Sequence, residues 1–450
     1  MSRASRLSGF TTAISGDTDL NVGIVTAKSL NVNQSFTFTD INVTGIATAN
    51  NLNVTGVSTL SNVVVGGATT ELVVTGDARV TGILTVGTSS LTLNGDSSTI
   101  TGITTINNIS IASSGTYSNR NVFDNGAMRI AQRQTSRAAL SDTPQFILDR
   151  WSYRRGGSWG SNSFTMSQET NNAPPEFLYY MRVEQSGTAA AVPSDTALYI
   201  STALEKSNMS VLSDGATGTK ECVISWYARG SRPGAYSLTL VKRGSTAESY
   251  TTTYSLTTDW QRFIKVIPAT LGQWGATLSA SQKAVDVYFT VAGDGSSSGI
   301  GTDTLDSWGA PARIVANTQE NSFASTSGAT FDITGIQLEL GNQATPFEHL
   351  PHAVELERCQ RYYQHFASGG AGTATNGNQT ASAQTGITFA TQMRDTPDII
   401  MGPFVNSTNS NGNILTNNIS KHGVNIQAQS SASGRQYWYV GLSSADAEFN

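Results

Sequence analysis

The sequence predicts a mainly β protein made of three successive β regions. Only 13% of its 450 residues are charged, and it holds 43 glycines among many serines, threonines and asparagines. Soluble domains usually carry ~25% charged residues. Ser and Asn compete for backbone hydrogen bonds and Thr is restricted at its first side-chain torsion, so this composition favours strands and turns over helix interiors. Apolar and polar residues alternate in many segments, and no long helical pattern separates them.

The first β region, residues 20–116, is a repeat of ten or eleven residues. The phrase "INVTGIATANN" at 41–51 is followed by "LNVTGVSTLSN" at 52–62. In the second phrase Leu52 and Val54 alternate with polar residues, which is the period of a half-buried strand, and a glycine then supplies a bend. The pattern therefore predicts a repeated strand and turn.

One copy of this repeat has too few apolar side chains to be stable by itself. Each unit offers three or four aliphatic residues, whereas ordering the chain costs roughly 1–2 kcal/mol per residue. We favour a parallel homotrimeric shaft, in which the aliphatic positions line a threefold axis. A single-chain β-solenoid and a disordered linker are the alternatives, and a trimeric shaft can be intertwined or built from three solenoids side by side.

The second β region, residues 117–348, contains most of the large aromatic residues and predicts a globular domain. Segments such as 221–230 and 284–293 alternate apolar and polar residues and are bounded by Gly, Pro and Ser turns. Antiparallel strands at this spacing, without long helices between them, predict a jelly-roll β-sandwich. Trp226 and Trp260 lie in strand patterns and are predicted to be core residues.

Two smaller regions follow the predicted sandwich. Residues 349–366 carry apolar side chains at helical spacing and predict one short connector helix packed on the core. The Gly-, Ala- and Thr-rich stretch after His365 is typical of a linker or long loop. Strand-like groups beyond it predict a small C-terminal β domain over residues 367–450, which we expect to be the distal tip.

Charge and composition argue against several partners. A formal net charge of −5 provides no basic surface for nucleic acid. No stretch reaches the ~18 apolar residues of a membrane span, and the N-terminus lacks the apolar core of a signal peptide, so we expect synthesis in a cytoplasm and no membrane insertion. Cys222 and Cys359 are too few for a disulfide framework or a zinc site. We predict no cofactor.

No pattern predicts an enzyme. Glycoside hydrolysis requires two facing carboxylates, and Glu339, Glu348 and Glu355 share one local segment in which nothing marks a pair. His349 and His352 have no third ligand at metal spacing, and no Gly-x-Ser-x-Gly elbow is present.

The loop at 292–306 holds three aspartates, Asp294, Asp303 and Asp306, that could offer oxygen ligands to Ca²⁺. Their spacing does not follow a known calcium loop. We favour a flexible turn here and predict no metal site.

Three tryptophans in turn-like segments are the candidate glycan-binding residues. Trp159, Trp274 and Trp308 each lie among small polar residues, as exposed loop aromatics do. An exposed indole ring can stack on the apolar face of a sugar. A half-buried packing role is the alternative for each of them.

Four phrases in the chain resemble a recurring module of bacteriophage tail fibre and tail appendage proteins. They are "NVFDNGAMRIAQR" at 121–133, "LDRW" at 148–151, "TTDWQRF" at 257–263 and "FDITGIQLELGNQATPFEHLPHAVELERCQRYYQ" at 331–364. The domain that holds them is similar to the galactose-binding-like, carbohydrate-binding jelly rolls, and the "VTG" repeats look like those of marine phage structural proteins.

Within "LDRW", Asp149 and Arg150 are neighbours that would point to opposite faces of a strand. We expect structural hydrogen bonds from them rather than ligand binding.

The resemblance implies a homotrimeric virion fibre that adheres to host-surface polysaccharide and performs no chemistry. Residues 1–19, with Arg3, Arg6, Leu7 and Phe10, would attach the shaft to a tail or capsid protein. The protein would be made in the host cytoplasm and displayed on the phage tail. A capsid decoration fibre on the head and a surface-glycan depolymerase are the alternative functions.

Overall fold

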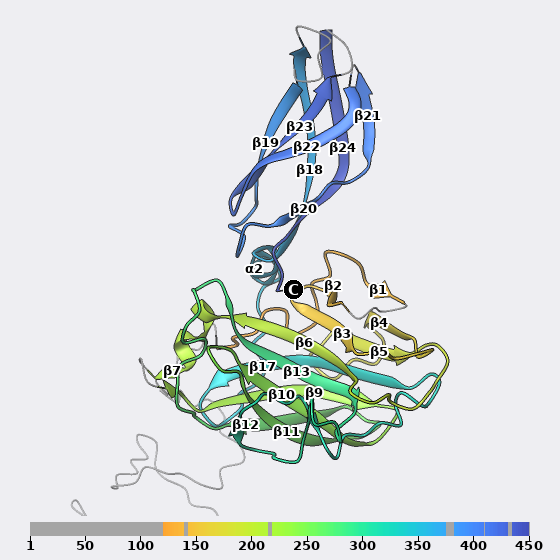
Figure 1. Cartoon of the computed structure of the whole chain (residues 1–450), viewed down its shortest axis with the longest axis vertical. Helices are drawn as coiled ribbons and strands as arrows, with labels where there is room; N and C mark the ends of the chain where they lie inside the picture. Colours follow the sequence, from red (N-terminus) through yellow and green to blue (C-terminus); the bar gives the residue numbers. More distant parts are fainter. Residues whose placement is uncertain are drawn as a thin grey trace, which may run out of the picture. The chain divides into compact units, whose positions relative to one another are not determined.

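The structure is a computed structural model that describes residues 120–138, 143–214, 218–374, 382–408, 410–430 and 434–449. These residues belong to one compact unit, Asn107–Asn450. The predicted repeat shaft and the attachment residues Arg3, Arg6, Leu7 and Phe10 lie outside the described residues. The described part is mainly β, which confirms the predicted fold class (Figure 1).

Two antiparallel sheets form the predicted sandwich (Figure 1). The six-stranded sheet has the order β1 (Ser136–Arg137), β4 (Phe164–Glu169), β5 (Tyr180–Gln185), β17 (Thr330–Leu340), β9 (Cys222–Gly230), β12 (Gln261–Ile267). The seven-stranded sheet has the order β15 (Trp308–Gly309), β11 (Glu248–Leu256), β10 (Gly234–Lys242), β13 (Lys283–Gly293), β6 (Ala197–Glu205), β3 (Trp151–Gly156), β2 (Gln145–Leu148).

Short elements complete the sandwich. They are the parallel pair β14 (Gly301–Thr302) and β16 (Val315–Ala316), the hairpin of β7 (Ser213–Asp214) and β8 (Gly218–Thr219), and the 3-10 helix η2 (Lys206–Leu212).

Large aromatic side chains fill the space between the two sheets. Trp226 of β9 is fully buried, and its ring lies 5.0 Å from that of Tyr254 and 5.4 Å from that of Phe289. Trp151 of β3 packs on Phe289 as well, with centroids 6.4 Å apart. Each such ring removes some 150–250 Å² from water, so this core stabilises the sandwich without help from another domain.

The sequence "DNG" at 124–126 forms a tight turn that positions the start of β3. Asn125 adopts a φ of 55°, and its side chain accepts hydrogen bonds from the backbone N–H groups of Arg129 and Ile130. A Cβ on Gly126 would lie 2.1 Å from the backbone oxygen of Ile336, so only glycine fits there. The backbone N–H of Ile336 in β17 donates to the backbone oxygen of Gly126 at 3.0 Å, so the turn is tied directly to the six-stranded sheet.

A short helix, α2 (His352–Gln360), follows the sandwich, as predicted. It buries Cys359 completely, whereas Val354 is 40% exposed. Tyr362 and Tyr363 are buried but lie beyond the helix, and Tyr363 begins the next strand. The predicted apolar stripe is therefore only partly helical.

Two further sheets make up the C-terminal region, residues 363–449 (Figure 1). One has the order β18 (Tyr363–Ala374), β24 (Gly434–Asp446), β20 (Asp398–Ile400), with β21 (Phe404–Thr408) also paired to β24. The other has the order β19 (Ser382–Thr388), β23 (Gly423–Ser430), β22 (Ser410–Ser420).

The linker predicted after His365 is wrong over residues 366–374 and 382–386, which lie in β18 and β19. Gly, Ala and Thr are typical of loops, but strand pairing is made by backbone groups, which any residue provides.

Among the described residues, no helix is long and apolar enough to cross a membrane.

Candidate functional site

The three tryptophans predicted to bind glycans do not form a site. Trp159 and Trp274 each expose only 2% of their surface. The indole N–H of Trp159 donates to the backbone oxygen of Gly156 at 3.1 Å, and that of Trp274 donates to Leu212 at 2.9 Å. The expectation that these two rings are exposed is wrong, because their polar loops fold back onto the core and leave no ring face open to a sugar. Trp308 is half-buried with its ring 5.7 Å from Trp274.

The two tryptophans predicted as core residues have different environments. Trp226 is fully buried, which confirms the prediction. Trp260 is half-buried instead, with its ring 5.3 Å from that of Tyr180 and 4.8 Å from the guanidinium of Arg229. Trp260 immediately precedes edge strand β12, so no further strand covers it.

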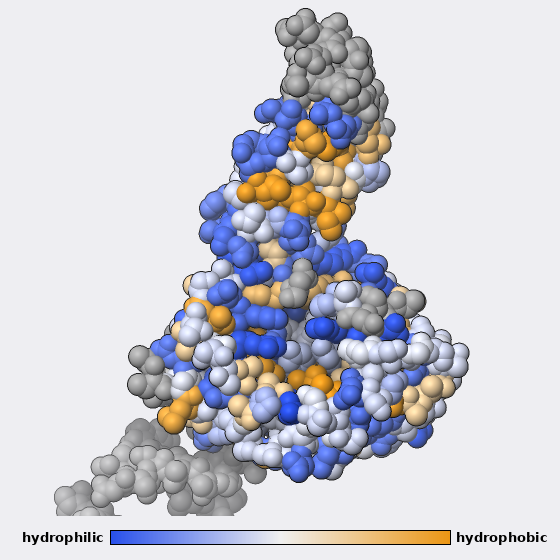
Figure 2. Space-filling view, in the orientation of Figure 1, coloured by the Kyte–Doolittle hydropathy of each residue, from blue (hydrophilic) through white to orange (hydrophobic). Residues whose placement is uncertain are grey.

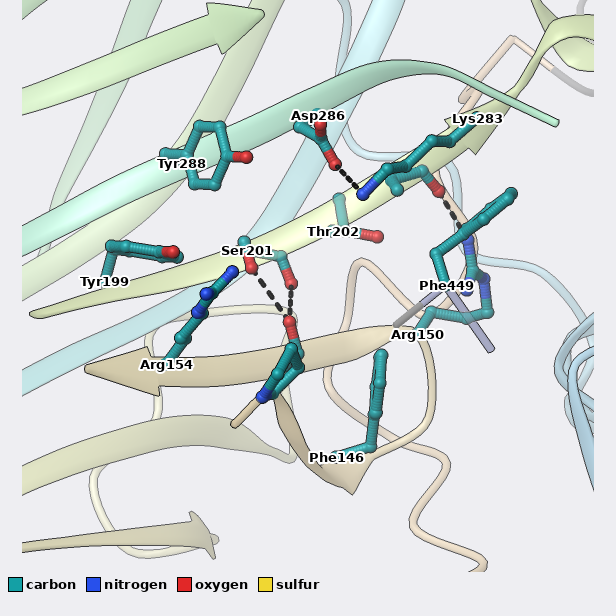
Figure 3. Close-up of a pocket in the computed structure, with 13 residues that line it drawn as sticks. Phe146, Arg150, Arg154, Tyr199, Ser201, Thr202, Lys283, Asp286, Tyr288 and Phe449 are labelled. Carbon is teal, nitrogen blue, oxygen red and sulfur yellow. Dashed lines mark hydrogen bonds and ion pairs between the residues drawn. The ribbon is translucent and has the colours of Figure 1, made fainter. Parts of the chain in front are cut away.

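Polar side chains gather instead on the outer face of the seven-stranded sheet. Strands β3, β6 and β13 lie side by side, and their register aligns Ser152, Ser201 and Tyr288 in one row. Arg154 and Tyr199 are paired in the adjacent row. The residues that alternate with them along each strand are core residues, so these side chains point outward. Figure 3 shows them around one hollow, which we call the first hollow.

Two tyrosines close one end of the first hollow. The rings of Tyr199 and Tyr288 meet edge to face, with centroids 4.9 Å apart and planes at 85°. Both pack in a cluster with Ile300 and Ile314 of the loop after β13. Burial raises the pKa of both tyrosines above the ordinary value. Their hydroxyl groups therefore stay protonated at neutral pH, as a donor to a ligand must be.

The floor of the first hollow carries hydroxyl groups and one carboxylate. The Oγ atoms of Ser152 and Ser201 lie 2.8 Å apart. Asp286 accepts a hydrogen bond from Nε of Arg243, and Nζ of Lys283 lies 3.4 Å from its Oδ1. Arg243 also donates to the hydroxyl of Tyr288 at 3.1 Å, so the charged and aromatic ends of the hollow are linked.

Two larger hollows share lining residues with the first hollow. The volume of the first hollow is about 70 Å³. A second hollow of about 510 Å³ shares Lys283 and Phe449 with it, and a third of about 430 Å³ shares Pro144 and Phe146. We call the three together the outer groove. Ligand pockets in proteins are usually ~300–1,000 Å³, so the first hollow alone is too small for an oligosaccharide whereas the outer groove as a whole is not.

Buried ion pairs connect the sandwich to the C-terminal region beside this groove. Arg150 is 2% exposed, forms an ion pair with Glu448 and stacks on the ring of Tyr362 at 3.4 Å from its centroid. Arg361, at the end of α2, donates two hydrogen bonds of 2.8 Å to Glu205 of β6. We call these contacts the ionic junction. Phe449 packs beside this junction, with its ring 6.1 Å from that of Tyr362 and 5.7 Å from the guanidinium of Arg150, and it lines the first hollow (Figure 3).

Asp149 and Arg150 lie in the turn between β2 and β3, so the predicted placement in a strand is wrong. The predicted structural hydrogen bonds are confirmed. Asp149 accepts a bond from the backbone of Gln132 at 2.9 Å and pairs with Arg133 at 3.2 Å. Burial raises the pKa of Asp149 to about 7, although Arg133 opposes that rise.

The aspartates and histidines considered as metal ligands are spread apart. Asp294 accepts hydrogen bonds from Ser296 in its own turn, and Asp306 accepts one from Tyr250 at 3.4 Å. Asp303 is exposed. The ring of His349 packs between aromatic rings, and His352 is an exposed residue of α2. In the described part of the chain, no group of three His, Cys, Asp or Glu residues could hold a metal ion.

The three glutamates weighed for catalysis have separate structural partners. Glu339 accepts hydrogen bonds from Thr345, and Glu348 accepts one from the backbone of Asn121 at 2.9 Å. Glu355 lies in α2, where burial raises its pKa to about 7. None of the three lines the outer groove.

Sequence reasoning missed the groove residues, although a signal for them exists. The strand "LYISTALE" at 198–205 alternates Leu and Ile with Tyr199 and Ser201, and "VDVYFT" at 285–290 does the same with Asp286 and Tyr288. A tyrosine and a polar residue on the outward positions of two apolar strands indicate a functional face. Their adjacency, however, depends on which strands pair.

No family model and no curated protein matches this chain. Among solved structures, this chain is similar to the family 11 carbohydrate-binding module of a cellulosomal cellulase of Clostridium thermocellum, with 12% identity and a TM-score of 0.24 over 47% of this chain and 98% of that chain. It is also similar to the CBM22-1 xylan-binding domain from Paenibacillus barcinonensis Xyn10C, with 12% identity and a TM-score of 0.24 over 46% of this chain and 95% of that one.

A third similar structure is the enzymatically active domain of tailspike protein 4 of bacteriophage CBA120. It shows 9% identity and a TM-score of 0.26 over 49% of this chain, and the match spans 22% of that chain. At these identities and TM-scores, the description of the fold rests on the strand order and register of this chain, and the function has to be argued from its own residues.

Proposed function

We propose that the outer groove binds glycans and that the chain acts as an adhesin. The observation that carries this proposal is the pair of half-buried residues Ser201 and Tyr288, which lie opposite each other on β6 and β13 in the lining of the first hollow. Saccharides present many hydroxyl groups together with small apolar ring faces. A site for them needs hydroxyl and charged partners around an aromatic surface, and the groove supplies both.

We propose binding without hydrolysis. Glycoside hydrolysis requires two facing carboxylates. The carboxylates of the outer groove lie in three separate hollows: Asp395 in the second, Asp446 in the third and Asp286 in the first, where its oxygens contact Arg243 and Lys283. Asp286 is therefore already engaged with two cations. Asp286 instead orients the side chains of Arg243 and Lys283.

We further propose that the chain is a homotrimeric fibre of a bacteriophage virion, displayed on the tail, that attaches to polysaccharide of the host surface. The resemblance of its phrases to tail fibre modules supports this assignment, as do the low-aromatic repeats at 20–116, which need neighbouring chains to bury their aliphatic positions. Attachment to a tail or capsid protein through residues 1–19 completes the proposal.

Filling the groove tests glycan binding. Ser201→Tyr places a large side chain on the groove floor, and the matched control, Ser255→Tyr, changes an exposed serine of β11 outside the groove. On a glycan array, the first variant should lose at least about tenfold in affinity, about 1.4 kcal/mol, and the control should bind as the unmodified chain does. Equal binding by both variants, with unchanged melting temperatures, would refute the groove as the site.

Light scattering tests the fibre assignment. The solution mass of the full chain is compared with that of a truncated chain that begins at residue 118. We expect a trimer for the full chain, and loss of the trimer on truncation would assign trimerisation to the repeats. A monomeric full chain would remove the physical basis of the fibre proposal, and labelled fibres on the head rather than the tail in micrographs would favour a capsid decoration.

A further inference from the structure

We infer that the second hollow of the outer groove binds an acidic group, so that the preferred ligand is an anionic saccharide. This inference rests on the proposed function, since it concerns the same groove. The second hollow is lined by Arg243, Gly244, Ala247, Leu278, Gln282, Lys283, Arg394, Asp395 and Phe449.

Positive charge is in excess around this hollow. Arg243 and Lys283 share one carboxylate, Asp286, so one of the two cations has no counter-charge within the trio. Both cationic side chains are about one third exposed, at 34% and 35%, and they can therefore reach a ligand. The chain as a whole has a net charge of −5, so this local excess does not follow from its composition.

A second ion-pair cluster has a similar arrangement, with Arg394 and Asp395 in the lining of the hollow and Lys421 outside it. Asp395 lies 3.8 Å from Arg394 and 3.6 Å from Lys421, so two cations again share one carboxylate. Arg394 donates its other hydrogen bonds to backbone oxygens, including that of Ser281 at 2.8 Å. These neutral carbonyl groups orient the guanidinium but do not neutralise its positive charge.

The positive charge of these two clusters suits the carboxylate of a sugar. Lys283 lines both the first and the second hollow, so it lies where a ligand that occupies the hydroxyl-rich floor would continue. An anion beside Lys283 would supply the missing counter-charge, and a hydrogen bond to a charged group is stronger than one between neutral groups. A neutral saccharide obtains no such gain.

A comparison of binding to a charged and to a neutral polymer tests the inference. Binding of the full chain to polygalacturonate, which carries uronate carboxylates, and to dextran, which is neutral, is measured by affinity electrophoresis at low and at physiological salt. We expect polygalacturonate to bind at least about tenfold more tightly, with a preference that weakens as salt increases.

Two variants of Lys283 and one control variant identify the residue responsible. Lys283→Gln should remove most of the preference, and Lys283→Glu should reverse it. Lys220→Gln, which changes an exposed lysine outside the groove, should retain it. Melting temperatures close to that of the unmodified chain exclude misfolding as the cause.

The outcomes separate this inference from the proposed function. If dextran binds as well as polygalacturonate and Ser201→Tyr abolishes both, the groove binds glycans and the anionic preference is refuted. If polygalacturonate is preferred but Lys283→Gln and Lys220→Gln behave alike, the second hollow is also refuted as the acidic subsite. If neither polymer nor any member of a glycan array binds, the proposed function and this inference fail together.

Discussion

The sandwich and the C-terminal region are both β structures, but their cores differ in kind. The sandwich core contains Trp151, Trp226 and Phe289 in direct ring contact. The core of the C-terminal region consists mainly of small and aliphatic residues, with Trp438 and Phe389 as its buried aromatics among the described side chains. Because the sandwich buries more aromatic surface, we expect it to be the more stable of the two regions.

Surface exposure shows the same contrast. Ile400 and Leu442 of the C-terminal region expose 60% and 61% of their surface. Figure 2 shows apolar side chains gathered over this region near β20. The C-terminal region is also held to the sandwich by ion pairs, Arg150 with Glu448 and Arg133 with Asp446.

The largest expected effect comes from the aromatic core. Trp226→Ala should lower the free energy of unfolding of the sandwich by about 4 kcal/mol, because it leaves a large cavity between the sheets. Trp438→Ala should lower only the transition of the C-terminal region. Calorimetry of the full chain measures both, and a shift of the sandwich transition by Trp438→Ala would contradict the difference between the two cores.

The next effect comes from the ionic junction. Glu448→Gln removes the nearer of the two carboxylates paired with Arg150, which is 2% exposed, and leaves Asp124 at 3.6 Å as its remaining partner; we expect a loss of about 3 kcal/mol. The exposed control, Asp395→Asn, should cost less than about 1 kcal/mol. Urea unfolding provides the measurement. A double variant, Arg150→Met with Glu448→Leu, should recover part of the loss, and no recovery would show that packing rather than charge is disturbed.

A smaller effect depends on pH. Burial raises the pKa of Asp149 from 3.8 to about 7, so the folded chain binds a proton that the unfolded chain releases in that interval. The contribution of this group to stability is therefore complete below about pH 3.8 and is lost as the pH rises through about 7, with a slope of at most about 1.4 kcal/mol per pH unit.

Asp149→Asn should flatten that slope, since an amide does not titrate and still accepts the hydrogen bond from Gln132. Asp303→Asn, at an exposed position, is the control and should leave the slope unchanged. Thermal unfolding between pH 4 and pH 8 distinguishes the two. Equal slopes for both variants would assign the pH dependence to other buried carboxyls, such as Glu355.

The smallest effect is expected at the exposed apolar surface. Ile400→Ser removes a side chain that is 60% exposed, so the stability of the single chain should change by less than about 0.5 kcal/mol. Chemical denaturation at low protein concentration measures this. A loss that grows with protein concentration would show that other copies cover this surface in the assembled protein.

Strand positions could largely be predicted from the sequence. The alternation at 284–293 predicted β13, which spans Lys283–Gly293, and the apolar spacing near residue 354 predicted α2. In these segments the spacing of the apolar residues indicates which face of the strand or helix is buried. The Gly- and Ala-rich part of β18 was not predicted, because its order comes from backbone pairing with β24, which is distant in the sequence.

The candidate site could not be predicted in the same way. Trp159 and Trp274 have the local sequence of exposed loop residues, yet the loops that carry them fold back onto the sandwich core. The groove brings together residues of β3, β6 and β13 with Phe449 near the C-terminus. Nothing in any one of these segments indicates the others.

By itself, the sequence determined the β class of this protein, the order of its regions and the alternation that separates the inner from the outer face of each strand. These properties depend on neighbouring residues and on composition. Only the tertiary structure decided which outward residues meet, which tryptophans are covered and where charge is in excess. Those outcomes depend on strand register and on contacts between distant segments, and both are set by the packing of the whole chain.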